Sequence, residues 1–565
     1  MLHFFDFEVF KHDWLVVIVD PTTRIETVIV NDTNKLKDYY EAHKNEIWVG
    51  YNSRGYDQYI LKGILLGFNP KEINDFIIVE GKKGWQFSSL FRKVPMNTYD
   101  VFHRATDRGL KTHEAFMGHN IKESSISFDI DRKLTDDEIR ETIEYCRHDV
   151  EETIEVFLHR KSEFDARMGL LKLFNLPLSY INQTDAQLTA IVLDAHRQSH
   201  DDDEFDIEFP STLRIDKYTH VVEWYKNWDN RDYSKSLKTD IAGVPHIFAW
   251  GGIHGALPQY SADGYFINMD VTSYYPSMMI KYNWLSRNVS DPKKFKEIYD
   301  MRVAFKAAKD PRQTPLKTPL NGTYGACKDK NNALYDPRQA NNVCVGGQLL
   351  LLDLIEKLEP YCDIIQSNTD GILVKLRKFD DFDLIDDIAY EWEHRTGMNL
   401  EFEEYVRVFQ KDVNNYLLVD AEGGIKSKGA YVKKLTDLDF DLPIVNKAAI
   451  KYMVYGTPIE STISACDDLR MFQKVVKVSG KYLHGLHGDK ILNDKVLRVF
   501  ASNRHNDKGV FKVKAGAKNP EKFANTPDNC FIDNGDIICK GVPPYLDKQW
   551  YIDVARERLK QFGVM

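Results

Sequence analysis

The sequence lacks the features of secreted proteins, of small proteins stabilised by bound zinc, and of membrane-bound proteins. Its 565 residues include seven scattered cysteines and no CxxC pair, which argues against a zinc finger or a disulfide framework. No apolar run approaches the roughly 18 residues of a membrane span. Charged residues from Asp6 to Asp13 interrupt the first apolar stretch, so we expect no secretory signal. Repeats and low-complexity segments are also absent. We therefore expect a reduced, cytoplasmic protein without membrane contacts.

The chain also lacks an excess of basic charge. Lysine and arginine number 75 against 85 aspartates and glutamates, a net charge of −10, and 43% of residues are hydrophobic. A uniformly basic coat for nucleic acid is therefore not expected, and the length suits three or four domains. Residues 441–565 nevertheless carry a net charge of +6. Within 470–522, 13 basic residues interleave with aromatic residues, which suits a nucleic-acid backbone or, alternatively, a solvated basic face.

One carboxylate interrupts an otherwise apolar pattern in the second half of the chain. In "IIQSNTDGILVKL" (364–376), apolar residues flank Asp370 and Gly371, and Asp-Gly predicts a hairpin turn with a positive φ. Turn chemistry alone explains such an aspartate, unless further carboxylates are brought to it from elsewhere. One candidate is Asp270, near the end of the strand predicted by "YFINMDV" (265–271).

Residues 1–160 alternate strand-like and helical patterns and carry a second set of carboxylates. "FFDFEVF" predicts a strand on which Asp6 and Glu8 point to the same side. Two such carboxylates can hold a divalent cation, although surface charge explains most DxE pairs. "YNSRGYDQYI" (51–60) adds Asn52, Tyr56 and Asp57.

A capping box at 135–138 predicts the start of a helix with an apolar stripe from Ile139 to Phe157. Tyr145 and Asp149 lie four residues apart on one face of this helix, at the edge of the stripe. A half-buried tyrosine and a solvated aspartate are the alternatives for these two positions.

The order DxE, Nx₃YD and Yx₃D resembles the three motifs of DnaQ-like 3′–5′ proofreading exonucleases. The resemblance implies an RNase H-like domain in which two Mg²⁺ or Mn²⁺ ions serve phosphodiester hydrolysis. Tyr145 would orient the attacking water, and Asn52 and Tyr56 would grip the single-stranded 3′ end. The implied metal ligands are Asp6, Glu8, Asp57 and Asp149.

A second group of motifs resembles family B DNA polymerases, whose patterns are DxxSLYPS, KxxxNSxYG and YxDTDS. They stand in this order as "DVTSYYPS" from Asp270, "KTPLNGTYG" from Lys317, and "SNTDG". With the exonuclease motifs, the resemblance covers roughly residues 1–430. It implies that Asp270 and Asp370 lie side by side on a palm sheet and share two Mg²⁺ ions, which prefer hard oxygen ligands.

The same resemblance implies the contacts with nucleotide and DNA. Lys317 would pair with the triphosphate, Asn321 and Tyr324 would pack on the nascent base pair, and Tyr275 would be a steric gate against ribonucleotides. Arg302 and Lys306, at i and i+4 on an expected helix, would face the same phosphates, or form a solvated basic face. The implied primer-strand contacts are Tyr416, Lys426 and Lys428.

Three positions depart from the family motifs. Asn368 replaces the first aspartate of motif C, although its amide oxygen still accepts hydrogen bonds. Gly371 replaces the following serine. Asn414 occupies the lysine position of the KxY motif, for which Lys411 is a candidate substitute.

Four further segments carry expectations about local structure. Trp250 directly precedes Gly251-Gly252, where the family has YxGG, and the glycine pair predicts a boundary or a close backbone approach. With Thr318 as N-cap and Pro319 at the first helical position, Lys317 would precede the motif B helix. We also expect a helix between about 292 and 310, and a solvated loop at "HDDDEFDIEF" (200–209).

The expected fold is α+β and multidomain. It comprises an exonuclease domain at 1–165, a connecting region at 166–250, a ferredoxin-like palm with short helical fingers at 251–440, and a thumb at 441–565. The expected function is a phage-type DNA polymerase with proofreading, acting on primer–template DNA and dNTPs as a monomer in the host cytosol. The alternatives are a nuclease with a degenerate polymerase half, supported by Asn368, and a non-catalytic scaffold that binds primer–template.

The spacing of the polymerase motifs bears on priming. Asp270 and Lys317 are 47 residues apart, and Lys317 and Asp370 are 53 apart. Protein-primed phage members carry long insertions in both intervals, which serve terminal-protein binding and strand displacement. We therefore expect no terminal protein and weak strand displacement.

Overall fold

The computed structural model of the protein describes residues 1–103 and 108–565. They form two compact units, each assembled from separated parts of the chain. Unit 1 comprises Met1–Asn182, Leu435–Val445 and Ile463–Tyr551, and unit 2 comprises Gln183–Lys434, Asn446–Thr462 and Ile552–Met565. Both units mix helices with sheets, which confirms the α+β multidomain class.

Unit 1 contains a mixed five-stranded sheet in the order β3-β2-β1-β4-β5. β1 pairs antiparallel with β2 and parallel with β4, and β4 pairs parallel with β5. The β-branched and aromatic residues of β1 and β2 are buried at nearly every position, as expected for strands covered on both faces. The strands are β1 (Leu2–Val9), β2 (Trp14–Asp20), β3 (Ile25–Val30), β4 (Ile47–Gly50) and β5 (Asn97–Asp100).

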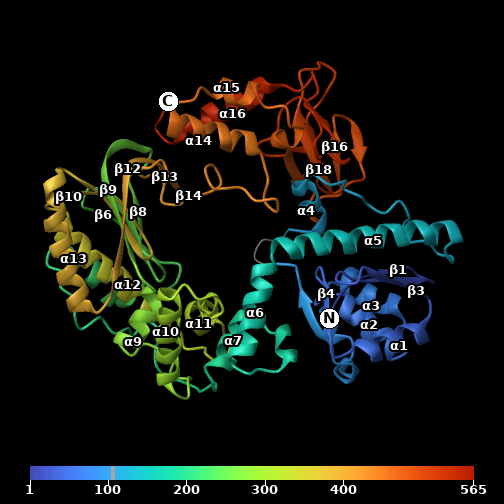
Figure 1. Cartoon of the computed structure of the whole chain (residues 1–565), viewed down its shortest axis with the longest axis horizontal. Helices are drawn as coiled ribbons and strands as arrows, with labels where there is room; N and C mark the ends of the chain where they lie inside the picture. The colour runs from blue at the N-terminus through green and yellow to red at the C-terminus, as the bar shows by residue number, and fades with distance from the viewer. Residues whose placement is uncertain (104–107) are drawn as a thin grey trace. The chain divides into compact units, whose positions relative to one another are not determined.

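Helices cover both faces of this sheet (Figure 1). On one face, Phe5 and Phe7 of β1 join a core with α1 (Thr33–His43), α2 (Asp57–Leu65) and α3 (Pro70–Asn74). On the other face, α5 (Asp136–His159) packs against β1, and the rings of Phe4 and Phe157 lie 5.2 Å apart. The capping box at Thr135 is confirmed. Because successive residues of a strand alternate in direction, Asp6 and Glu8 share the α5 side with Phe4.

The segment Ile463–Tyr551 completes unit 1 with two small antiparallel sheets, in the orders β15-β18-β21 and β17-β16-β19-β20. Arg498 of β18 is fully buried and donates to the carbonyls of Ala115 and His119, at the end of α4 (Leu110–Met117). The strands are β15 (Lys474–Lys477), β16 (His484–His487), β17 (Lys490–Leu492), β18 (Val496–Ala501), β19 (Val510–Val513), β20 (Glu521–Lys522) and β21 (Cys530–Ile532).

Unit 2 is built on a nine-stranded antiparallel sheet in the order β14-β13-β12-β9-β11-β10-β8-β7-β6. The long strand β9, which carries Asp270, is central and pairs with β11 and β12. The strands are β6 (Ser236–Ile241), β7 (Val244–Ala249), β8 (His254–Ala256), β9 (Tyr260–Val271), β10 (Cys362–Asn368), β11 (Gly371–Leu376), β12 (Leu400–Asp412), β13 (Asn415–Val419) and β14 (Ile425–Lys428).

The helices of unit 2 include α12, which is buried along almost its whole length and packs against α9, α11 and α13. Trp392 of α13 donates its indole N–H to the carbonyl of Leu350 in α12, at 3.0 Å. The helices that lie wholly in this unit with eight or more residues are α7 (Asp185–Val192), α8 (Thr219–Lys226), α9 (Tyr274–Lys281), α10 (Pro292–Ala307), α11 (Lys317–Lys328), α12 (Pro337–Leu358) and α13 (Phe382–Thr396). The helix expected near 292–310 is thus confirmed.

The start of α11 differs from the expectation. Lys317 is the first residue of the helix and Leu316 is its N-cap, so the prediction that Thr318 caps the helix and that Lys317 precedes it is wrong. Pro319 fits at the third position because the first-turn amides of a helix have no acceptor within it.

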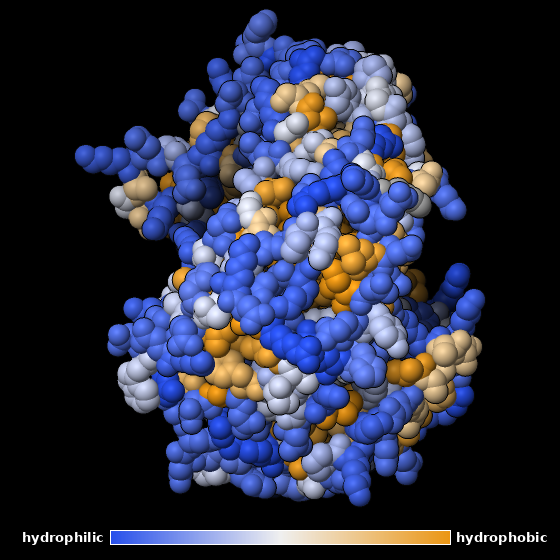
Figure 2. All heavy atoms as spheres, turned by 90° about the vertical axis from the view of Figure 1, so that its left-hand side faces the viewer, coloured by the Kyte–Doolittle hydropathy of each residue, from blue (hydrophilic) through white to orange (hydrophobic). Residues whose placement is uncertain are grey.

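The face of the molecule drawn in Figure 2 is largely polar. In Figure 2, hydrophilic side chains cover most of the face shown, with small hydrophobic patches between them. Among the described residues, each helix is too short or too polar to cross a bilayer.

A buried ion pair in unit 2 gives a stability prediction. Arg395 and Asp353 are 8% and 0% exposed and lie 2.9 Å apart. Arg395→Met should lower the free energy of unfolding of unit 2 by about 3–5 kcal/mol, because Asp353 stays buried without its counter-charge. Arg556→Met should lower the free energy of unfolding, measured in urea, by less than about 1 kcal/mol. Both side chains of the pair between Arg556 and Glu460 are exposed to water. Equal costs would contradict the prediction.

Candidate functional site: two carboxylate clusters

The first cluster gathers four carboxylates from three elements of unit 1. β1 supplies Asp6 and Glu8, whose oxygens come within 4.8 Å of each other and of the Cys146 sulfur. Asp57 begins α2, directly after the turn that follows β4, and its Oδ1 accepts the amide of Phe7 at 3.2 Å. Asp149 comes from α5. The structure therefore brings together the four acidic residues that the sequence predicted.

Burial and mutual repulsion make this cluster electrostatically unfavourable by itself. Burial raises the pKa of Asp6 and of Glu8, and the neighbouring charges of Asp57 and Asp149 raise both pKa values further. Burial also raises the pKa of Asp57 to about 7 and that of Asp149 to about 6. Carboxylates in such a position are stabilised by cations, and an all-oxygen donor set fits Mg²⁺ or Mn²⁺.

Lys111 of α4 is a member of this cluster that the sequence did not reveal. Its ammonium makes a short contact with Asp149 and lies 3.0 Å from the fully buried Glu114. It also lies over the ring of Tyr145, 4.8 Å from the centroid. Although burial opposes its charge, Asp149 and Glu114 hold the pKa of Lys111 above its usual value. No motif marks this lysine, because Asp149 and Tyr145 come from a different helix, α5.

The other predicted residues of this cluster border it. Burial and the charges of the cluster raise the pKa of the Tyr56 hydroxyl, which donates to Asn74 at 2.8 Å. Asn52 lies in the turn between β4 and α2 with a φ of 60°, and its amide N–H donates to Asp100 at 2.8 Å. Asp100 therefore shapes the turn that presents Asp57, a role that the sequence did not indicate.

The second cluster forms where β9 meets the hairpin of β10 and β11 in unit 2. Gly371 is the cross-strand partner of Asp270, and the amide of Val271 donates to the carbonyl of Asp370 at 2.7 Å. Burial and the charge of Asp270 raise the pKa of Asp370. The two predicted aspartates therefore lie side by side.

Two glycines permit this close approach. A Cβ on Gly371 would lie 2.0 Å from Oδ1 of Asp270. A Cβ on Gly252 would lie 2.9 Å from the Thr369 hydroxyl, and the Thr369 amide donates to the carbonyl of Ile253. The close approach expected at the glycine pair is thus found at Gly252, whereas a Cβ on Gly251 would meet no atom of the described residues within 4 Å apart from its chain neighbours.

The geometry of the turn differs from the expectation. Asn368 pairs with Gly371, so the two-residue turn is Thr369-Asp370, and the positive φ of 54° belongs to Thr369. The prediction of a turn at Asp370-Gly371 is therefore wrong by one residue. Gly371 is instead the first residue of β11, where the absence of a side chain leaves room for the Asp270 carboxylate.

Lys426 is the closest cation to the second cluster among its predicted residues. Its ammonium lies 3.0 Å from Asp270 and 2.5 Å from Glu403 of β12. Asn268, two residues before Asp270 on β9, donates to the same two carboxylates. Neither Asn268 nor Glu403 was predicted. The alternation of Glu401 and Glu403 along a strand was the available signal.

The remaining predicted primer-strand residues surround this cluster. Lys428 of β14 is the cross-strand partner of Tyr416. The charges of Lys428 and Lys426 act to lower the pKa of Asp370, against the dominant effect of burial. Lys411, the candidate substitute in the KxY motif, pairs with Asp412 at 3.1 Å and lies over the ring of Tyr431.

The predicted nucleotide-binding residues come from α9, α10 and α11. The rings of Tyr275 and Tyr324 meet at 4.7 Å in a T-shaped contact. Lys317 and Asn321 are exposed on one side of α11, while Leu320 and Thr323 are buried on the other.

The two basic residues of α10 make separate contacts. Arg302 donates to the hydroxyl of Ser273 at 2.9 Å, and Lys306 pairs with Glu401 at 2.9 Å. Lys328, which was not predicted, lies over the rings of Tyr324 and Tyr233 and donates to the carbonyl of Trp250.

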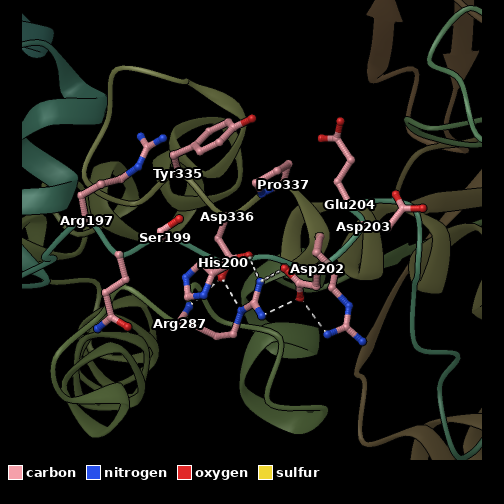
Figure 3. Close-up of a pocket in the computed structure, with 12 residues that line it drawn as sticks. Arg197, Ser199, His200, Asp202, Asp203, Glu204, Arg287, Tyr335, Asp336 and Pro337 are labelled. Atoms are coloured by element: carbon pink, nitrogen blue, oxygen red, sulfur yellow. Dashed lines mark hydrogen bonds and ion pairs between the residues drawn. The ribbon is translucent and has the colours of Figure 1, made fainter.

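A pocket of about 560 Å³ elsewhere in unit 2 contains none of the predicted site residues (Figure 3). Arg287 binds Asp202 at 2.7 Å and the fully buried Asp336 at 2.8 Å, and Arg338 also binds Asp202. The acidic stretch 200–209 is therefore a loop, as expected, but the expectation that it is solvated is wrong for Asp202. The Asp202 carboxylate forms ion pairs with Arg287 and Arg338.

Comparison with solved structures finds a likeness over the whole length of the chain. The family B DNA polymerase from the hyperthermophilic archaeon Pyrobaculum calidifontis matches with a TM-score of 0.44 and 15% sequence identity, over 100% of this chain and 78% of that chain. No protein-family model matches the sequence, and no curated protein matches it. At this TM-score and identity, the likeness establishes neither the family nor the activity of the chain.

The raised pKa of Asp57 predicts how the stability of unit 1 depends on pH without divalent ions. Folding raises this pKa from 3.8 to about 7, so the folded state binds more protons between these values and loses stability as the pH rises through them. Asp57→Asn should therefore unfold at higher denaturant than the unaltered protein at about pH 8 in EDTA, and should show a weaker dependence on pH. Added Mg²⁺ should stabilise the unaltered protein more than the variant. A less stable variant at about pH 8 would refute this expectation.

Proposed function

We propose that the protein is a DNA-directed DNA polymerase of the family B type with a 3′–5′ proofreading exonuclease. The observation that carries the proposal is the adjacency of Asp270 and Asp370, which stand 100 residues apart in the sequence and meet across the pairing of Asp270 with Gly371. The first cluster supports the nuclease half independently, because its four carboxylates come from three motifs in the expected order.

The donor atoms of both clusters fit hard divalent ions. Asp270 and Asp370 would hold them in unit 2, and the four carboxylates of the first cluster would hold them in unit 1. Two Mg²⁺ or Mn²⁺ ions bound at each place would neutralise phosphate oxygens and lower the pKa of the attacking oxygen.

In unit 2, the residues of α9, α10 and α11 bind and orient the nucleotide. Lys317 contacts the triphosphate from the exposed side of α11, and Arg302 and Lys306 of α10 add positive charge for the same phosphates. Asn321 and Tyr324 pack against the nascent base pair. The ring of Tyr275, fixed by its contact with Tyr324, excludes a 2′-hydroxyl.

In the same unit, Lys426, Lys428 and Tyr416 contact the primer strand. Lys426 pairs with Asp270 and Glu403 in the structure, so divalent ions at Asp270 would repel its ammonium. We infer that Lys426 then turns to the primer phosphates, while Glu403 keeps its bond to Asn268.

In unit 1, Tyr145 orients the attacking water, and Asn52 and Tyr56 hold the single-stranded 3′ end. The ammonium of Lys111 lies over the face of the Tyr145 ring and contacts Asp149. It fixes both side chains and reduces the charge of the cluster.

The domain assignment follows the same proposal. The strand order β3-β2-β1-β4-β5 supports an RNase H-like exonuclease in residues 1–165, and the sheet around β9 supports a palm in 251–440. The basic segment 441–565 is proposed as the thumb. Phage replication in the host cytosol as a monomer, without a terminal protein, is the proposed setting. Robust extension through long duplex DNA without a helicase would refute the expected weak strand displacement.

A nuclease with an inactive polymerase half is the second candidate, and Asn368 favours it. The side chain of Asn368 lies at the end of β10, beside its cross-strand partner His254. It brings one charge fewer to the second cluster than the aspartate of the family pattern. A scaffold that only binds primer–template is the third candidate.

A primer-extension assay separates these candidates. With a mismatched 3′ primer–template, Mg²⁺ and dNTPs, the protein should first trim the mismatch and then extend the primer. Asp270→Ala should abolish extension and spare trimming, and Asp57→Ala should abolish trimming and spare extension of a matched primer. Trimming without extension would support the nuclease, and DNA binding without either reaction would support the scaffold.

Gly371→Ala tests the clearance on which the polymerase site depends. The new Cβ would stand 2.0 Å from Oδ1 of Asp270, so the carboxylate must move, and a displacement of about 1 Å can reduce a rate about 100-fold. Single-nucleotide incorporation should fall by at least that factor, while trimming is unchanged. Gly541→Ala is the control, because among the described residues only its own chain neighbours have atoms within 4 Å of its Cβ position. Normal incorporation by Gly371→Ala would refute the assignment.

A further inference from the structure

A separate group of donor atoms lies on the face of the five-stranded sheet that is opposite the first cluster. His3 stands on β1 and points to the same side as Phe5 and Phe7, away from Asp6 and Glu8. His43 is the last residue of α1, and Glu46 lies in the loop that leads into β4. The three side chains thus come from three neighbouring segments of unit 1.

The donor atoms converge on one point. Oε2 of Glu46 makes a short contact with Nε2 of His3 and lies 3.0 Å from Nδ1 of His43, and the three atoms are within 4.8 Å of one another. In a tetrahedral zinc site, bonds of about 2.0–2.1 Å place the donor atoms about 3.3 Å apart. An ion therefore fits between these atoms after shifts of a few tenths of an ångström to about one ångström.

The outer shell of this group resembles that of a metal site. Nδ1 of His3 lies 2.9 Å from the hydroxyl of Tyr39, and a partner on the second ring nitrogen is what fixes the tautomer and orientation of a metal-bound histidine. The ring of the fully buried Trp48 packs against His3 and Tyr39. These contacts hold the His3 ring in place before any ion arrives.

The charge of the group also favours a cation. The Glu46 carboxylate supplies negative charge between the two imidazole rings, because its Oε2 contacts both of them. His43 stands at the C-terminal end of α1, where the helix dipole attracts positive charge. The side chains of His43 and Glu46 are 29% and 30% exposed, so one side stays open to water.

We propose that His3, His43 and Glu46 form a Zn²⁺ site with three protein ligands and one water. Two imidazole nitrogens and one carboxylate oxygen are a donor set that suits zinc and nickel rather than Mg²⁺. The bound ion joins β1, the end of α1 and the entry to β4, and so stabilises this edge of unit 1. The site does not depend on the proposed polymerase activity.

Equilibrium dialysis against micromolar Zn²⁺ in millimolar Mg²⁺ tests the proposal. The full chain should bind one Zn²⁺ more per molecule than His43→Ala and Glu46→Gln, because any zinc held by the carboxylate clusters is common to all three. His159→Ala is the matched control: this histidine is a partly exposed residue of the same unit that pairs only with Glu155 among the ion pairs described. It should bind as much Zn²⁺ as the unaltered chain.

Two further measurements guard against misfolding and against weak surface binding. Tyr39→Phe leaves all three ligands in place and should weaken Zn²⁺ binding about 10-fold to 100-fold, as expected for an outer-shell contact. Zn²⁺ should raise the melting temperature of the unaltered chain more than that of Glu46→Gln. If His43→Ala and Glu46→Gln bind as much Zn²⁺ as the unaltered chain, or if binding appears only at millimolar Zn²⁺, the proposal is overturned and the group is a hydrogen-bonded cluster only.

Discussion

Repulsion between carboxylates that are held close together is the constraint on which both clusters depend. Burial, and in addition each neighbouring negative charge, raises the free energy of the ionised state and with it the pKa values of Asp6, Glu8 and Asp370. The fold holds these groups together by backbone pairing, which does not depend on their charge. In the second cluster this is the register of β9 and β11, with a glycine at the point of closest approach.

Each cluster also contains a lysine that bridges two carboxylates. Lys111 contacts Asp149 and Glu114, and Lys426 contacts Asp270 and Glu403. Each ammonium group contacts two carboxylates, and these neighbouring carboxylates act to raise the pKa of both lysines. Each lysine therefore acts as an internal counter-ion that partly offsets the charge of the carboxylates it contacts.

The sequence predicted those parts of the structure that depend on local pattern and motif order. The capping box at Thr135, the strand that carries Asp270 and the convergence of the acidic residues are all present. The position of the positive φ was missed because Asp-Gly is a strong turn signal, yet here the glycine gives cross-strand clearance and Thr369 takes the strained conformation. Long-range partners such as Lys111 and Glu403 were missed because a charged side chain looks the same in sequence whether it pairs at a distance or is solvated.

The buried Arg498 has a consequence for how the chain folds during synthesis. Its guanidinium donates hydrogen bonds to the carbonyls of Ala115 and His119, which leave the ribosome 383 and 379 residues earlier. Until the segment around Arg498 arrives, these acceptors and the apolar surface near Ala115 stay uncovered. We therefore expect the nascent N-terminal half to expose apolar surface that chaperones bind, and the long sequence separation of these contacts favours slow maturation.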